Sequence, residues 1–345
     1  MQADKLRPFY LQSSFIRCRL DSTGVPHHNA LEGLTVPPAS HRCLILSACF
    51  IVSLLPGSSA MQQASPPPVP SAKQEKPQRP RTLRREIELA LVNVTVLDPA
   101  DRFVTDLVKE DFRIFDNEVE QEALYLSTEQ VPVSVGVIFD VSGSMSGYVE
   151  SARLAAVQFL KAANPQDEIF LVLFNGRAHL LTDFTHDIRE VESQLLWAKT
   201  GGLTAMYDGI YLGLNQMTKA RNTRRALFVI TDGQENHSRY NARDVQRILR
   251  ESDVQIYTIG AGSSNYLMVN ELAERSGGRA FGYADAADIA EKVSQELRSQ
   301  YVLAYRPSNS KPDGLWHKVK VRVRTRPGLP PLSVYARSGY YAAKR

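Results

Sequence analysis

Residues Val137–Gly147 read VIFDVSGSMSG, an apolar run that ends in Asp140 and is followed by three serines at alternate positions. The apolar run has the composition of a strand that is buried on both faces of a parallel sheet. Polar groups at the end of such a strand need partners, because buried polar groups are almost always hydrogen-bonded or bound to a ligand. The stretch therefore predicts a buried strand that presents oxygen atoms at one edge of a sheet.

Apolar runs of the same kind recur in the middle of the chain, at Val133–Phe139, Ile169–Phe174, Leu227–Ile230 and Val254–Ile259. Between them, apolar residues recur at helical spacing, as at Leu154, Val157 and Leu160 and again at Ile289, Val293 and Leu297. This alternation of strands and helices is typical of the α/β class. It predicts a doubly wound, mostly parallel, Rossmann-like sheet over residues 131–299.

Three loops of this predicted domain carry oxygen-bearing side chains. Asp140 and Asp232 each end a predicted strand, and ligands of open α/β sheets bind beyond the carboxyl ends of the strands. The loop Lys199–Gly209, KTGGLTAMYDG, turns at two glycines and places Thr204 just before a predicted helix. If the loops converge, they offer two carboxylates and three hydroxyls, which belong to Asp140, Ser142, Ser144, Thr204 and Asp232.

This set of side chains suits a hard divalent cation, since oxygen ligands without imidazole or thiolate favour Mg²⁺, Mn²⁺ or Ca²⁺ over Zn²⁺. Five protein groups leave one octahedral position for water or for a carboxylate of a partner. Taken singly, the serines and the threonine could cap helices and the aspartates could close turns. An EF-hand is excluded, because its register would need glycine at Met145 and glutamate at Ser151.

The motifs DVSGS, GGLTAMYDGI and ITDG resemble the three metal-binding loops of the von Willebrand factor A (VWA) domain. The metal-ion-dependent adhesion site (MIDAS) of that family follows the pattern Asp-x-Ser-x-Ser, Thr and Asp. The resemblance implies that Asp140, Ser142, Ser144, Thr204 and Asp232 bind a metal, usually Mg²⁺. The segments on either side of the domain are similar to those of a bacterial, largely acidobacterial, group of secreted VWA-related proteins.

Two strand-rich segments flank the α/β domain, at residues 83–130 and 300–345. Their short, β-branched runs are separated by turn residues. Each segment is too small to be a stable domain alone, but together they reach the size of a β-sandwich. We expect them to pair, so that the α/β domain is inserted into a sandwich.

Residues 1–60 are predicted to be an N-terminal extension and a signal peptide, with an apolar h-region at 43–55 and cleavage near Ala60. The position of this segment favours a translation start at a non-ATG codon near Val25 or Val36. The apolar run is short for a membrane span, although an N-terminal anchor is the alternative. The protein is therefore expected to be secreted, or held in the periplasm or the cell envelope.

Residues 61–82 are rich in proline and poor in large apolar side chains, which is typical of a disordered linker. The three cysteines of the chain, Cys18, Cys43 and Cys49, all precede the predicted cleavage site. The mature chain is therefore expected to have no disulfide.

Two further features have competing interpretations. In HKVKVRVRTR, from His317 to Arg326, basic and apolar residues alternate. A solvated face on an edge strand is the preferred interpretation, because lysine-rich edges deter aggregation, and a polyanion-binding patch is the alternative. His237 follows Asp232 closely but is not expected to bind the metal, because a hard oxygen site has no need of imidazole.

We predict a metal-dependent, adhesion-type protein-binding module, in which a partner supplies an acidic side chain. A structural envelope component with a stabilising metal is the first alternative, and a metal-assisted hydrolase is the second. Haloacid-dehalogenase phosphatases carry a second Asp where this chain has Ser142, and neither HExxH nor GxSxG is present. The chain is thus not expected to be an enzyme. With a net charge of +4, it is not expected to bind nucleic acid.

Overall fold

The computed structural model describes residues 15–19, 86–260, 266–282, 286–308, 314–324 and 330–342. The predicted h-region at 43–55 and the predicted linker at 61–82 lie outside the described residues. The chain divides into two compact units, of which one comprises Met1–Arg17 and Ile87–Arg345. The elements described below belong to this unit, apart from Cys18 and Arg19 of the strand at Phe15–Arg19 and Glu86 of the strand at Glu86–Leu97.

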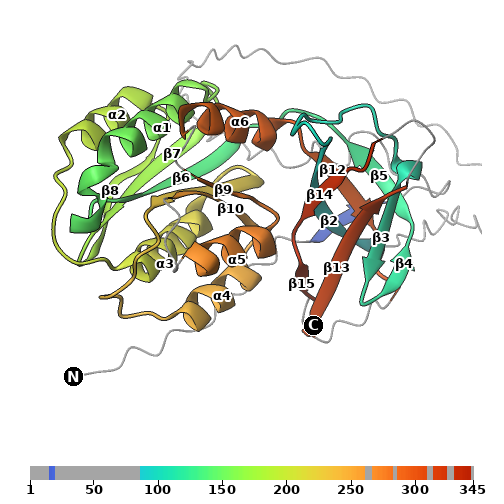
Figure 1. Ribbon diagram of the computed structural model, residues 1–345. Coiled ribbons are helices and arrows are strands. Elements are labelled where there is room, and N and C mark those ends of the chain that lie inside the picture. Colours follow the sequence, from blue (N-terminus) through green and yellow to red (C-terminus); the bar gives the residue numbers. More distant parts are fainter. Residues whose placement is uncertain are drawn as a thin grey trace, which may run out of the picture. The chain divides into compact units, whose positions relative to one another are not determined.

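A six-stranded sheet forms the centre of the α/β domain, with the strand order β11-β10-β9-β6-β7-β8 (Figure 1). Neighbouring strands are parallel except β8, which is antiparallel to β7. The strands are β6 (Val133–Asp140), β7 (Glu168–Phe174), β8 (Ala178–Thr185), β9 (Arg224–Thr231), β10 (Val254–Gly260) and β11 (Ala280–Gly282). The doubly wound, mostly parallel sheet predicted from the sequence is confirmed.

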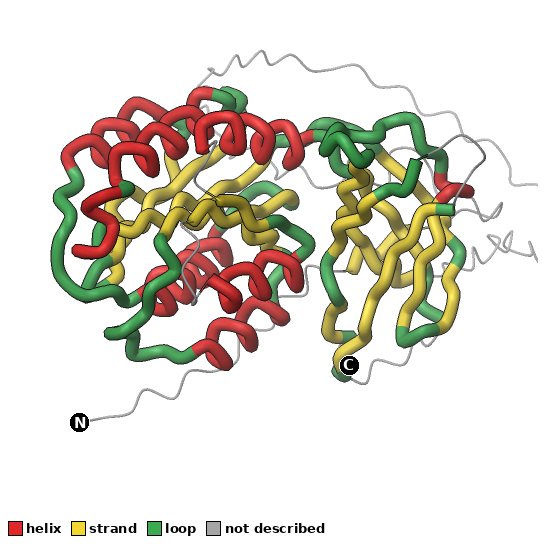
Figure 2. Tube along the Cα trace, in the orientation of Figure 1, coloured by secondary structure: helices red, strands yellow, loops and turns green. Residues whose placement is uncertain are grey.

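Helices cover both faces of this sheet (Figure 2). One layer comprises α1 (Val149–Lys161), α2 (Ile188–Trp197) and α6 (Ala286–Arg298). The other comprises α3 (Met206–Gln216), α4 (Ala242–Glu251) and α5 (Tyr266–Ser276). Two short 3-10 helices, η4 (Gly143–Gly147) and η5 (Met217–Lys219), complete the domain.

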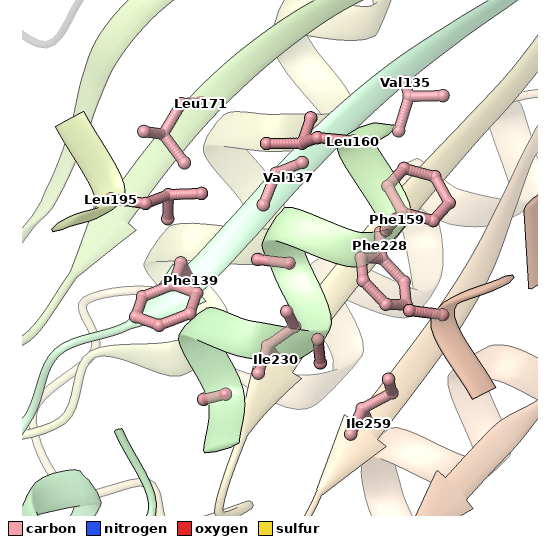
Figure 3. Packing of buried hydrophobic residues seen from close by; sticks show 14 of the residues in the cluster. Val135, Val137, Phe139, Phe159, Leu160, Leu171, Leu195, Phe228, Ile230 and Ile259 are labelled. Atoms are coloured by element: carbon pink, nitrogen blue, oxygen red, sulfur yellow. The ribbon is translucent and has the colours of Figure 1, made fainter. Parts of the chain in front are cut away.

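Strand β6 is buried along its whole length because its side chains alternate between the two layers. Val137 and Phe139 belong to the cluster that includes Phe159 of α1, as Figure 3 shows. Ile138 belongs to the opposite cluster, with Ile210 of α3. This packing fixes the direction of β6 and thereby the position of Asp140 at its end.

The flanking segments form two antiparallel sheets. One contains β1 (Phe15–Arg19), β2 (Glu86–Leu97), β12 (Tyr301–Tyr305), β5 (Ala123–Ser127) and β14 (Ser333–Ala336). The other contains β15 (Gly339–Tyr341), β13 (Trp316–Val323), β3 (Phe112–Asp116) and β4 (Val119–Gln121), and η3 (Lys109–Asp111) precedes β3. Strand β1 lies in the predicted N-terminal extension, where the sequence analysis did not expect a strand.

Strands from the two ends of the chain pair with each other, as expected. Strand β12 lies between β2 and β5, and β13 pairs with β3. Both sheets contribute to one apolar core, which includes Val94 of β2, Ile114 of β3, Leu303 of β12 and Val319 of β13. The α/β domain is therefore inserted into a flanking β-sandwich.

The interpretation of β13 as an edge strand is wrong, because β13 lies between β15 and β3. The alternation itself is present: Lys318 and Lys320 are exposed, whereas Val319 and Val321 are buried. Sequence periodicity assigns the two faces of a strand, but its place in the sheet depends on partners that are distant in sequence.

A buried polar network joins the last helix of the α/β domain to the sandwich. Glu296 of α6 is fully buried and accepts hydrogen bonds from Tyr257 Oη (3.2 Å) and Arg279 Nη1 (3.3 Å). Gln300 Nε2 donates to Tyr257 Oη (3.2 Å) and to Thr95 Oγ1 of β2 (3.3 Å). Burial raises the pKa of Glu296 to about 7, although the charge of Arg279 and the hydrogen bonds from Arg279 and Tyr257 lower it.

We predict that Glu296→Gln stabilises the protein above neutral pH. The raised pKa means that the folded protein holds a proton between about pH 4.5 and 7 that the unfolded chain has released, so stability falls across this interval. Glutamine mimics the protonated form, and the variant should gain up to roughly 3 kcal/mol above pH 7 and almost nothing near pH 4.5. Chemical denaturation at several pH values measures the difference.

The matched control is Glu291→Gln, which removes an exposed carboxylate from the same helix and should change the stability by less than about 0.5 kcal/mol. A loss of stability in Glu296→Gln at pH 8 would mean that the ion pair with Arg279 outweighs the burial of the charge.

Candidate metal centre

Asp140 and Asp232 leave the same edge of the central sheet. Asp140 is the last residue of β6, and Asp232 directly follows β9. These strands are parallel neighbours, with Phe139 opposite Ile230. Both aspartates are buried, at 0% and 4% exposure. The strand ends therefore bring the two predicted carboxylates together.

The Asp140 carboxylate connects its own loop to the neighbouring strand. Its Oδ1 accepts from the backbone N–H of Ser142 (2.8 Å), and its Oδ2 accepts from Thr231 Oγ1 (2.7 Å). Thr231 Oγ1 in turn accepts from the N–H of Gly233 (3.1 Å). Both oxygens of Asp140 are thus oriented before any ligand binds.

The two predicted serines lie next to each other in the turn after β6. Ser142 precedes η4 and is fully buried, whereas Ser144 lies within η4 and is partly exposed. Their Oγ atoms are 3.1 Å apart. The 3-10 turn therefore brings the two hydroxyls to one side of the loop.

Two backbone hydrogen bonds hold the loop that contains Thr204 against the first loop. Gly143 N donates to Gly202 O (3.0 Å), and Gly201 N donates to Val141 O (2.8 Å). Gly202 has a φ of +83°, which disfavours other residues, and a side chain at Gly143 would come within 3.2 Å of Gly202 O. Glycine is therefore strongly favoured at position 202, and a side chain at position 143 would crowd the neighbouring loop.

The loop after β9 holds Thr204 from the other side. The Thr204 N–H donates to Asn236 Oδ1 (2.9 Å), and its carbonyl accepts from the backbone N–H groups of Asn236 and His237 (both 3.0 Å). Thr204 is 2% exposed. His237 thus contributes its backbone to the site, and its side chain is exposed.

Glu235 and Asp208 fix this third loop to α3. Glu235 Oε2 accepts from the backbone N–H of Tyr207, in the first turn of α3 (3.1 Å). Asp208 Oδ1 accepts from the backbone N–H groups of Arg239 (2.9 Å) and Tyr240 (3.0 Å). Thr231, Asp208, Glu235 and Asn236 were not predicted from the sequence, although Glu235 and Asn236 come just after the ITDG motif and were a usable signal.

The electrostatics of the site favour a cation. Burial raises the pKa of Asp140 to about 6, and the negative charge of Asp232 acts in the same direction, whereas the hydrogen bonds from Ser142 and Thr231 lower it. A divalent ion near these carboxylates would favour their ionised forms. The donors are two carboxylates and three hydroxyls, which fits a hard divalent cation. Within the described ranges, no three His, Cys, Asp or Glu side chains are gathered tightly enough to hold a metal.

Comparisons with known proteins agree on the domain type. Residues 135–296 match the sequence profile of the von Willebrand factor type A domain. Inter-alpha-trypsin inhibitor heavy chain H3 of Pongo abelii is 25% identical over 160 residues, which cover 41% of this chain and 18% of that protein. The chain spans about a fifth of the length of the first such relatives.

Solved structures of low sequence identity are similar to part of this chain. An aerotolerance-related membrane protein from Bacteroides fragilis has a TM-score of 0.41 at 21% identity, covering 48% of this chain and 98% of that one. Proximal thread matrix protein 1 of the mussel byssus, solved with a zinc-occupied MIDAS motif, has a TM-score of 0.43 at 17% identity, covering 53% and 49%.

We predict that Ser142→Ala and Thr204→Ala each weaken Mg²⁺ binding about tenfold or more, because each removes one oxygen from the proposed coordination shell. Isothermal titration with Mg²⁺ and Mn²⁺ measures the effect. Ser146→Ala is the matched control, since Ser146 is an exposed serine of the same turn and is not one of the five residues. Equal affinity in Ser142→Ala and Ser146→Ala would contradict the assignment.

Proposed function

Because residues 135–296 form a von Willebrand factor type A domain, we propose that this protein binds another protein through a divalent cation. One observation carries the proposal: five oxygen-bearing side chains come from three loops that are hydrogen-bonded to one another at one edge of the sheet. The proposed ligands of the cation are Asp140, Ser142, Ser144, Thr204 and Asp232. Mg²⁺ is the proposed ion, with Mn²⁺ or Ca²⁺ as alternatives.

The proposed ligands leave the cation able to attract a further anionic group. Two carboxylates balance a divalent charge, and three neutral hydroxyls add none. When bound, the cation supplies a Lewis-acidic position for an oxygen of the partner. We therefore propose that the partner contributes an aspartate or glutamate side chain.

The exposed surface beside these loops suits a protein partner. Leu203, next to Thr204, is 50% exposed, and Tyr148, at the end of η4, is 45% exposed. Arg177 and Lys199 are exposed on the neighbouring loops. Apolar and basic side chains beside a metal site are complementary to an acidic residue with an apolar neighbour.

We further propose that the chain is not an enzyme. The Asp140 carboxylate is engaged by the Ser142 backbone and by Thr231. At the position two residues later, where a dehalogenase-type phosphatase carries its general acid, stands Ser142. A structural envelope component, in which the metal only stabilises the loops, is the alternative.

Export to the cell surface or the periplasm completes the proposal. It is supported by the apolar segment at 43–55 and the small residues that follow it. Among the described helices, none combines the length and the apolar character needed to cross a bilayer.

A pull-down without a covalent crosslinker tests the proposed function. The full chain should retain an envelope or secreted protein in Mg²⁺ and release it in EDTA. Asp140→Asn should lose that partner at least tenfold, whereas Ser146→Ala should keep it. Partner retention that ignores both EDTA and Asp140→Asn would contradict metal-dependent binding. If EDTA instead lowers the melting temperature and no partner depends on the metal, the structural alternative holds.

A further inference from the structure

A basic cavity lies away from the metal centre, where α4 and α5 meet strand β13. Its volume is about 500 Å³. Four cationic side chains, one indole and one hydroxyl line it. They belong to Arg250, Arg275, Lys318, Lys320, Trp316 and Ser338. In the described part of the chain, no acidic side chain lines this cavity. All of these residues belong to the compact unit that includes Ile87–Arg345.

Specific contacts join the helices to the sandwich around this cavity. Arg250, at the end of α4, lies over the ring of Trp316, with Cζ 5.9 Å from the ring centroid. The backbone N–H and the Oγ of Ser338 both donate to the carbonyl of Arg275, each at 3.0 Å. One carbonyl at the end of α5 is therefore already satisfied by a residue of the cavity.

The acids near this cavity neutralise it only in part. Arg275 pairs with Glu271 at 2.6 Å, and Lys318 pairs with Glu118 at 3.4 Å. All four side chains are more than a third exposed, and such surface pairs contribute at most about 1 kcal/mol. Neither Arg250 nor Lys320 has a carboxylate partner among the described residues. The cavity therefore carries a positive potential.

Edge protection alone does not explain the basic residues of this cavity. Strand β13 is not a free edge strand, because it pairs with β15 over Trp316–Lys318 and with β3 over Val319–Val323. If the lysines of β13 served only to keep one face of the strand in water, no cations from other elements would be needed beside them. Arg250 and Arg275, from two helices of the α/β domain, nevertheless line the same cavity. Bringing four like charges into one cavity is unfavourable unless an anion compensates them.

We propose that this cavity binds a multiply charged oxyanion, a phosphate or sulfate ester, with its charged groups on the four cations and its ring or carbon skeleton against Trp316. Guanidinium groups recognise such oxyanions through paired hydrogen bonds. The volume is in the range of cavities that hold a small molecule, or one unit of a larger anionic ligand. This site is independent of the proposed metal centre.

Tryptophan fluorescence gives a local readout of binding. The chain has two tryptophans, and Trp197 is 81% exposed at the end of α2. Trp197→Phe therefore leaves Trp316 as the only tryptophan. In this background we expect saturable fluorescence changes with inositol hexakisphosphate or sucrose octasulfate, and none with neutral inositol or sucrose. The more strongly bound probe identifies the ester as phosphate or sulfate.

Two double variants that lose the same charge distinguish binding in the cavity from general electrostatic attraction to a basic protein. Arg250→Ala with Lys320→Ala should weaken the binding of the preferred probe at least tenfold. Arg243→Ala with Arg322→Ala removes exposed arginines from the same helix and strand, outside the cavity, and should weaken it less than threefold. Circular dichroism checks that both variants fold.

Either of two results would overturn the proposal: no saturable binding of either probe, or an equal loss of affinity in the two double variants. EDTA should leave the affinity unchanged. Failure of the metal-dependent pull-down would therefore leave this result unaffected.

Discussion

The buried carboxylate of Asp140 is the interaction on which the arrangement of the site depends. It accepts one hydrogen bond from the turn that follows β6 and one from Thr231 at the end of β9. Burial raises the pKa of Asp140, and Asp232 adds to that effect. Two buried acids at one edge of a sheet are an unfavourable arrangement without a cation. The same arrangement is favourable for a protein that binds a divalent ion there.

Much of the fold and the five proposed ligands could be predicted because they depend on local patterns. A strand buried on both faces reads as a continuous apolar run, and the carboxyl ends of parallel strands share an edge, so Asp140 and Asp232 could be placed together. Asn236 and Glu235 were missed because their partners are distant in sequence. Thr204 and Tyr207 belong to a loop and a helix that come near the loop after β9 only in the folded domain.

Strand order and burial at the junction depend on the tertiary structure. The alternation in β13 predicted which side chains face solvent, but not that β15 would cover the strand on one side. Likewise, helical spacing from Ile289 and Val293 places Glu296 on the apolar face of α6. Its partners in the buried network, Tyr257 and Arg279, are distant in sequence, so local sequence could not identify them. Sequence reasoning considered a polyanion-binding role for the basic residues of β13, but it could not show that Arg250 and Arg275 from two helices lie beside Lys318 and Lys320.

The central claim is that three loops hold one divalent cation between the five predicted residues. X-ray diffraction from crystals grown with Mn²⁺ tests it most directly, because the anomalous signal of manganese locates the ion without assuming its ligands. The account predicts one strong anomalous peak within coordination distance of Asp140, Ser142, Ser144, Thr204 or Asp232, directly or through bound water. An ordered site without such a peak, or a peak bound by other residues, would contradict it.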